Sequence, residues 1–195
     1  MIGLRRGTVA LYAHEPEWDE EARRTVLRLR EILGDAAKDM QHVGSTAVSS
    51  IRAKPIIDIA VAVESFEAIL ALEPKLQAAG FYFRPGADIP DQLLFACGSW
   101  YDGTGDLQTH FIHVVLENSD QWNDYIAFRD YLNATPSAAK AYEALKLSLA
   151  EKAPVDAGRK QYLQGKHDFI SQTLEKARAF RAETRKEDSP CVKCI

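Results

Sequence analysis

An apolar run with a single carboxylate inside it constrains this chain more than any other segment. Residues 56–63 read Ile-Ile-Asp-Ile-Ala-Val-Ala-Val, and the short length and β-branched residues of this run indicate a buried strand. A lone carboxylate in such a strand is costly unless it is paired or binds a cation. Asp58 is therefore predicted to bind a metal or ligand. The alternative is that it caps a nearby backbone group or pairs with Arg52 or Lys54.

A Gly-Ser turn lies shortly before this strand, in the segment His42-Val43-Gly44-Ser45-Thr46-Ala47-Val48. Gly44 lets the backbone approach a ligand closely, because glycine lacks a Cβ and can adopt positive φ. Ser45 and the amides around it can then donate hydrogen bonds to a phosphate; a serine that only stabilises the turn is the alternative. Gly44, Ser45 and Thr46 are thus the predicted phosphate-binding residues of a site for a metal-bound nucleotide.

Several further motifs accompany the turn and the strand. They are Ala53-Lys54-Pro55-Ile56-Ile57-Asp58, Thr109-His110-Phe111-Ile112-His113-Val114-Val115, Phe128-Arg129-Asp130-Tyr131-Leu132, Tyr142-Glu143-Ala144-Leu145-Lys146 and Tyr162-Leu163-Gln164-Gly165-Lys166. Over about residues 9–180 the chain thereby resembles the GrpB family, which belongs to the nucleotidyltransferase superfamily with the polymerase-β-like fold. The resemblance implies an α+β fold with a mixed β-sheet, packed helices and a helical C-terminal half. Some members of the family are fused to a dephospho-coenzyme A kinase domain.

One departure from the superfamily pattern bears on catalysis. Superfamily enzymes usually carry a second carboxylate two residues after the first, so that both side chains share one face of the strand. Ala60 occupies that position here. Its presence weakens a two-metal transfer mechanism and leaves open a single-metal site, with Mg²⁺ or another divalent cation as the expected cofactor.

The histidines of residues 110–116 differ in their expected roles. On a regular strand His113 shares a face with Phe111 and Val115, while His110 faces the opposite way. Apolar residues on both faces predict that this strand is central. The resemblance to nucleotidyltransferases implies that it lies beside the Asp58 strand, with His113 as a metal ligand or general base. A core histidine bonded to the backbone is the alternative. His42 and His110 are predicted to support the site from behind, His42 by orienting the turn or a ligand.

Basic residues are the expected ligands of a triphosphate. Lys54, at the entrance of the Asp58 strand, is one candidate; Arg129, Lys146 and Lys166 lie in the helical half, each in a family-like segment. Arginine can bind phosphate in a bidentate manner, and lysine acts as a point charge. Ordinary surface salt bridges are the alternative, and a shared orientation toward Asp58 would favour phosphate binding.

Composition and charge limit the class of protein. A chain of 195 residues, 46% hydrophobic and 27% charged, can bury a core as one domain, predicted over residues 1–184 with a polar tail over 185–195. The net charge of −4 gives no general attraction to long nucleic acid or to an anionic membrane, so any phosphate site must be local. The lack of a bilayer-length apolar stretch and of a signal-peptide pattern predicts a cytoplasmic protein.

The cysteines do not form a disulfide framework. Cys97 lies in an apolar run and is predicted to be a buried, inert thiol. Cys191 and Cys194 form a single Cys-x-x-Cys after a polar stretch, which is weak evidence for zinc or redox chemistry and is more typical of a frayed tail.

Periodicity predicts the order of the elements. A first helix is expected over about 17–33, and Pro74 predicts one kinked helix or two short ones over 65–79. From residue 119 onward the pattern is helical, with a break at Pro136 and one last helix over about 159–183. Strands are expected over 81–84, 93–97 and 110–116.

The leading functional hypothesis is a metal-dependent transfer of a nucleotidyl group from a nucleoside triphosphate to a small-molecule hydroxyl or amine. The alternative is a non-catalytic nucleotide- or ligand-binding module on a degenerate fold.

Overall fold

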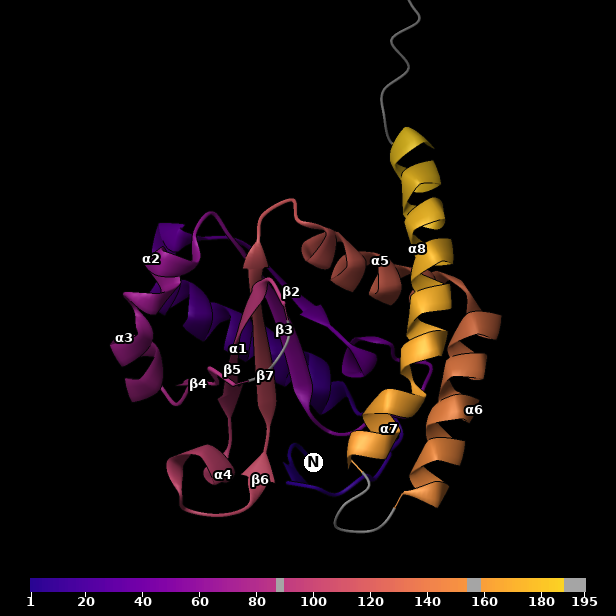
Figure 1. Cartoon of the computed structure of the whole chain (residues 1–195), viewed down its shortest axis with the longest axis horizontal. Helices are drawn as coiled ribbons and strands as arrows, with labels where there is room; N and C mark the ends of the chain where they lie inside the picture. Colours follow the sequence, from indigo (N-terminus) through magenta and orange to yellow (C-terminus); the bar gives the residue numbers. More distant parts are fainter. Residues whose placement is uncertain (87–89, 154–158, 188–195) are drawn as a thin grey trace, which may run out of the picture.

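The computed structural model describes residues 1–86, 90–153 and 159–187, and a five-stranded mixed sheet forms its centre (Figure 1). The strands lie in the order β2 (Ala37–Val43), β3 (Ile57–Val63), β7 (His110–Leu116), β5 (Gln92–Cys97) and β4 (Tyr82–Phe83). β3 and β7 are parallel, whereas the other neighbours are antiparallel. The predicted α+β class, the mixed sheet and the central position of β7 are confirmed.

A second, two-stranded sheet and several short helices complete the sheet side of the molecule. β1 (Leu4–Arg5) pairs with β6 (Leu107–Gln108). Between the strands lie the short α4 (Ser99–Asp102) and the 3₁₀ turns η1 (Gly34–Ala36) and η2 (Ser45–Ala47). As predicted from Pro74, the segment after β3 forms two helical pieces, α2 (Phe66–Leu70) and α3 (Glu73–Ala78).

Helix α1 (Pro16–Leu33) covers one face of the sheet. It begins with Pro16, whose fixed φ suits the first helical turn, and ends before Gly34, which has φ 51°. Its buried stripe packs against alternate residues of β3, and the cluster includes Trp18, Ala22, Leu29, Leu33, Ile57, Ile59, Val61 and Val63. Half-buried Cys97 also packs against this cluster. Burial raises the pKa of its thiol to about 12, in agreement with the predicted inert role.

The opposite face of β3 carries small side chains and receives helix α5 (Asp120–Ala134). Trp122 and Ile126 of α5 pack on Ala60 and Ala62 of β3 and on Val115. Because the side chains of the two alanines are small, the helix can lie close to the sheet. Ala60 is completely buried there, so the position of the absent second carboxylate faces packed apolar side chains rather than solvent.

The C-terminal helices extend from α5. Helix α6 (Pro136–Lys152) begins at the predicted break at Pro136, and α8 (His167–Glu187) packs along α5 (Figure 1). The predicted single helix over 159–183 is wrong, because one residue, Lys166, separates α7 (Arg159–Gly165) from α8. At this break α7 lies so close to α6 that a Cβ on Gly165 would be 2.4 Å from Leu149 Cδ2.

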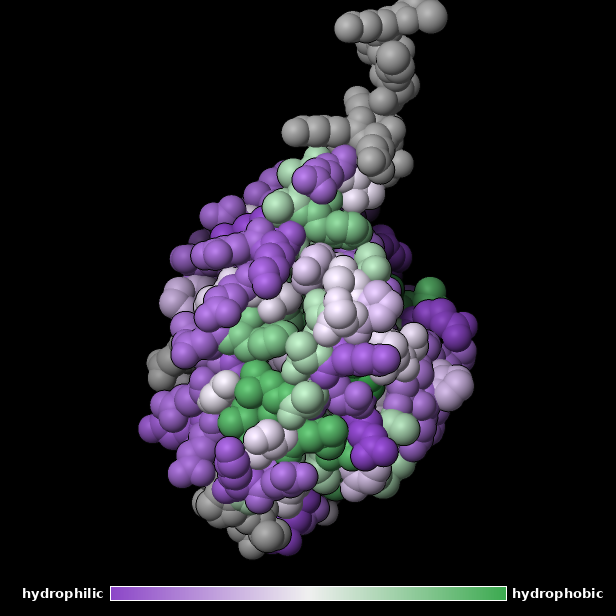
Figure 2. Space-filling view, turned by 90° about the vertical axis from the view of Figure 1, so that its right-hand side faces the viewer, coloured by the Kyte–Doolittle hydropathy of each residue, from purple (hydrophilic) through white to green (hydrophobic). Residues whose placement is uncertain are grey.

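The face formed by the C-terminal helices combines apolar and hydrophilic surface (Figure 2). Leu163 of α7 is among the exposed apolar residues of the protein. In the part of the chain that the structure describes, no helix is long and apolar enough to cross a membrane. Cys191 and Cys194 lie outside the described residues.

We expect Ala60→Asp to destabilise the protein rather than to restore a second catalytic carboxylate. A charge buried against Trp122 and Ile126, beside His113 whose two ring nitrogens are already engaged, should lower the free energy of unfolding by about 3 kcal/mol or more. Urea denaturation measures the change. Ala141→Asp, at an exposed position of α6, is the control and should cost below about 1 kcal/mol. Equal stability of the two variants would contradict the packing described for this face.

Candidate functional site

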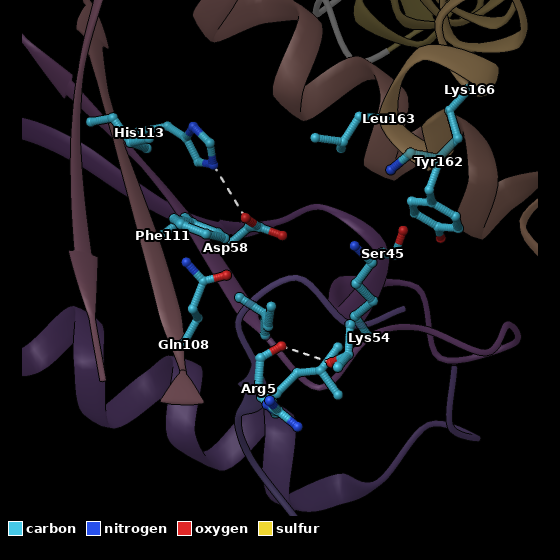
Figure 3. A pocket seen from close by; sticks show the side chains of 14 residues that line it. Arg5, Ser45, Lys54, Asp58, Gln108, Phe111, His113, Tyr162, Leu163 and Lys166 are labelled. Atoms are coloured by element: carbon cyan, nitrogen blue, oxygen red, sulfur yellow. Dashed lines mark hydrogen bonds and ion pairs between the residues drawn. The ribbon is translucent and has the colours of Figure 1, made fainter. Parts of the chain in front are cut away.

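Asp58 is held between a glycine turn and a histidine of the neighbouring strand. It lies near the start of β3, opposite Val43 of β2 and Phe111 of β7. Its Oδ1 is 3.2 Å from His113 Nε2 (Figure 3). Its Oδ2 lies 2.6 Å from where a Cβ on Gly44 would stand, and Gly44 has φ 71°. Both the backbone conformation and the space taken by the carboxylate therefore require glycine at this position.

A hydrogen-bonded chain continues from His113 away from Asp58. His113 Nδ1 is 3.0 Å from the hydroxyl of Tyr125 on α5, and this hydroxyl is 2.9 Å from Gln92 Oε1 on β5. The rings of His113 and Tyr125 also lie against each other, with 5.0 Å between their centroids. Burial raises the pKa of Tyr125, so its hydroxyl keeps its proton and acts as a donor.

The protons of this chain can be arranged in two ways. An ionised carboxylate only accepts, so His113 Nε2 carries a proton toward Asp58 in both. If Tyr125 donates to Gln92 Oε1, its oxygen accepts from Nδ1 and His113 is an imidazolium. If the Gln92 amide is turned over, its Nε2 donates to Tyr125, which donates to Nδ1 of a neutral His113.

The two arrangements leave different atoms of the Gln92 amide without a partner. In the first, Gln92 Nε2 is buried and has no hydrogen-bond partner among the described residues; turning the amide over gives Nε2 the bond to Tyr125 and puts Oε1 in the unpartnered position. In either arrangement His113 Nε2 is a donor that orients Asp58. For His113 to bind a metal through Nε2, as predicted, Nε2 would have to lose this proton.

A cavity of about 280 Å³ opens beside Asp58, and basic and polar side chains line it together with apolar ones such as Phe111 and Leu163 (Figure 3). The ammonium groups of Lys54 and Lys166 lie 4.4 and 4.7 Å from the centroid of the buried Tyr162 ring. A ring face attracts a cation and thereby helps to fix its position. Ser45 lines the same cavity and shares a hydrogen bond with Tyr142. Thus Ser45, Lys54 and Lys166 line the same cavity as Asp58.

Lys146 and Arg129, the other predicted phosphate ligands, bind the protein's own backbone instead. The Lys146 side chain is only 1% exposed and donates from Nζ to the carbonyl of Arg52. Burial, with a smaller effect of the charge on Lys166, lowers the pKa of Lys146 to about 7. Arg129 donates to the carbonyl of His42 at 2.9 Å and pairs with Asp130. Neither residue lines the cavity, because each ties a helix to a loop or strand.

The remaining predicted residues lie behind the cavity. His42 Nε2 is 2.9 Å from Thr46 Oγ1, so His42 contacts the turn, while Thr46 itself is buried. Burial lowers the pKa of His42 to about 4, which keeps the ring neutral. His110 faces α1, with Nε2 3.3 Å from Glu21 Oε1, and burial lowers its pKa. It lies on the opposite face of the sheet from Asp58.

The side chains of the site fit a metal ion that binds together with phosphates, and they do not fit a two-metal site. Within the described ranges, no group of three or more His, Cys, Asp or Glu side chains is placed to hold a metal ion. Two-metal sites need more carboxylates than Asp58 alone provides. Mg²⁺ can nevertheless be bound through one carboxylate when substrate phosphates supply further oxygens. The site therefore fits a cation that arrives with its ligand, held by Asp58.

Three residues that shape the site, Tyr125, Tyr162 and Gln92, are not among those predicted from the sequence. A phenolic hydroxyl on a buried helix face was the available signal, since buried Tyr hydroxyls usually find a partner. Gln92 carried no local signal, because its role depends on the pairing of β5 with β7.

We expect Gly44→Ala to displace Asp58 and to cost more stability than a glycine substitution that meets only backbone strain. The new methyl group would overlap Asp58 Oδ2 and weaken the hydrogen bond between Asp58 and His113. Gly80→Ala is the matched control, because Gly80 has φ 87° and nothing within 4 Å of an added Cβ. The control should lose about 1 kcal/mol, and Gly44→Ala clearly more, in chemical denaturation. A smaller loss at Gly44 would argue against the close approach.

The pKa of Lys146 predicts a specific pH dependence of stability. Its folded pKa of about 7 lies below the ordinary value of 10.5, so between these pH values the unfolded chain binds a proton that the folded chain lacks. The free energy of unfolding should therefore rise with pH over this window, by an amount on the order of a few kcal/mol. Lys146→Met should flatten the rise relative to wild type. Lys140→Met, at an exposed position of the same helix, should not; parallel profiles for all three proteins would refute a neutral buried Lys146.

Comparison with known proteins identifies the family. A sequence profile described as "GrpB protein" matches residues 8–176. "Glutamate-rich protein GrpB" of Alkalihalophilus pseudofirmus is 39% identical over 175 residues, covering 89% of this chain and 98% of that protein. A "Dephospho-CoA kinase" of Mycolicibacterium paratuberculosis is 33% identical, and the match covers 78% of this chain but only 42% of the kinase. The crystal structure of GrpB from Enterococcus faecalis matches with a TM-score of 0.77 at 28% identity, covering 86% of this chain and 96% of the other. The chain belongs to the GrpB family.

Proposed function

We propose that this protein binds a nucleoside triphosphate beside Asp58 and transfers its nucleotidyl group to a hydroxyl or amine of a small-molecule acceptor. One observation carries the proposal: a single cavity places two lysines and a serine hydroxyl around one carboxylate (Figure 3). Ammonium groups and hydroxyls are common ligands of phosphate oxygens. The carboxylate would repel phosphates if it were alone, so its presence among cations favours a ligand that brings a cation of its own.

The residues of the cavity suit this chemistry in distinct ways. Lys54 and Lys166, held against Tyr162, are positioned in advance to stabilise negative charge that develops on departing pyrophosphate. Ser45 would orient a phosphate oxygen. Asp58, fixed by His113, would hold a divalent cation such as Mg²⁺, which offsets phosphate charge when bound. The acceptor atom would form its bond to the α-phosphorus as the bond to pyrophosphate breaks, with its proton passing to solvent.

A non-catalytic binding module is the second candidate, and two observations favour it. Ala60 is buried under Trp122, so a second carboxylate cannot complete a two-metal site at that position. Asp58 Oδ1 is already engaged by His113, which leaves fewer oxygens for a cation. Both candidates require the triphosphate site, and they differ only in turnover.

A thermal-shift titration of wild type and Asp58→Asn with the four common nucleoside triphosphates tests the site. Each titration is made with and without Mg²⁺ or Mn²⁺. A ligand at 100 times its Kd stabilises the folded state by about 2.7 kcal/mol, so binding should raise the Tm of wild type in a metal-dependent manner. Asp58→Asn should lose the metal-dependent part and keep the fold, because the amide oxygen can still accept from His113. Lys166→Met should lose most of the shift, whereas Lys140→Met serves as the control.

Turnover separates the two candidates. Release of pyrophosphate by wild type with a bound triphosphate and a panel of small alcohols and amines supports the transferase, provided that Asp58→Asn abolishes it. Binding without pyrophosphate release supports the binding module. If no triphosphate raises the Tm of wild type, the triphosphate site itself is refuted.

A further inference from the structure

A second cavity lies on the other side of Asp58. It has a volume of about 340 Å³ and shares Ser45, Asp58 and Lys166 with the first cavity. The two cavities therefore meet at the proposed phosphate site. Lys54 lines only the first cavity, so the basic side chains are concentrated on one side of this junction.

The walls of the second cavity are largely aromatic and apolar. Tyr125, Phe128 and Tyr142 line it together with Ile170 and Leu174 of α8. The aromatic side chains are held by one another: the Phe128 and Tyr142 rings meet edge to face, with 5.5 Å between their centroids. Because these rings are fixed by packing, they present faces and edges to a ligand at little entropic cost.

The polar groups of the second cavity carry little net charge away from the junction. Asp124 lines the cavity but forms two hydrogen bonds with Arg178, at 2.7 and 2.6 Å, which offset its charge. Gln92 and Gln121 contribute side-chain amides, which can both donate and accept hydrogen bonds. This combination suits a flat ring that carries donors and acceptors on its edge and no charge.

We propose that the second cavity binds an uncharged heteroaromatic ring presented next to the phosphates in the first cavity. This inference rests on the proposed function, since it assigns the ring that accompanies the triphosphate. The ring has two sources with the same chemistry: the base of the donor nucleotide or the body of the acceptor. Stacking on aromatic side chains and hydrogen bonds from the amides would hold either one.

Leu174→Trp tests the assignment, because it fills the second cavity without touching the first. Binding of sodium tripolyphosphate, the four nucleoside triphosphates and the four nucleosides is measured by isothermal titration with Mg²⁺ present. Phe128→Leu is a second variant, which removes an aromatic wall instead of adding bulk. Lys54→Met alters the first cavity instead of the second. Leu27→Trp, at an exposed position of α1, is the control for introducing a tryptophan.

If the ring is the base of the donor, wild type should bind at least one nucleoside triphosphate about 10-fold or more tightly than tripolyphosphate. Leu174→Trp and Phe128→Leu should lose this excess and leave tripolyphosphate binding unchanged. Lys54→Met should weaken both ligands by the same factor. Leu27→Trp should behave as wild type.

If the ring belongs to the acceptor, nucleoside triphosphates should bind no more tightly than tripolyphosphate. A nucleoside should then bind the tripolyphosphate complex and lose that binding in Leu174→Trp. The inference is overturned if ring-bearing ligands bind equally to wild type and both cavity variants, or if the ring adds no affinity in any combination. Failure of tripolyphosphate to bind wild type would refute the phosphate site, and nucleoside binding alone would then decide the role of the second cavity.

Discussion

The site depends on how one carboxylate is kept in place within a buried sheet. His113 reaches Asp58 because β3 and β7 are parallel neighbours, with Ala60 directly opposite His113. Gly44 leaves room for the other carboxylate oxygen because it has no Cβ. Tyr125 and Gln92 then fix the ring of His113 from behind. Asp58 is half-buried, with 28% of its side chain exposed, and the strand register, the turn and the hydrogen-bonded chain together offset the cost of its partial burial.

The two faces of the sheet have separate tasks. Large aliphatic side chains of β3 meet α1 within one hydrophobic cluster, whereas the alanines of β3 let α5 lie close on the other face. That close approach carries Tyr125 to His113. The break between α7 and α8 brings Lys166 to the same place, next to Tyr162. The cavity thus forms where the helical half meets the start of β3.

Much of this arrangement could be predicted from local sequence. The Asp58 strand, the glycine turn and the central strand with His113 and His110 on opposite faces follow from periodicity and glycine geometry, and the family resemblance implied the α+β class. The roles of the basic residues could not be separated in this way. Lys146 and Lys166 look alike in sequence, yet Lys146 binds the carbonyl of Arg52 while Lys166 lines the cavity. Only the tertiary path of the loop before β3 decides which lysine is used.

The proposed function depends on phosphates binding between the lysines and Asp58. The decisive measurement is a crystal structure of the protein with Mg²⁺ and a nucleoside triphosphate analogue that cannot be hydrolysed. We expect phosphate density in contact with Ser45, Lys54 and Lys166 and adjacent to Asp58, with the hydrogen bond between Asp58 and His113 retained. Phosphates bound elsewhere, or an analogue bound with Lys54 and Lys166 turned away from it, would refute the site.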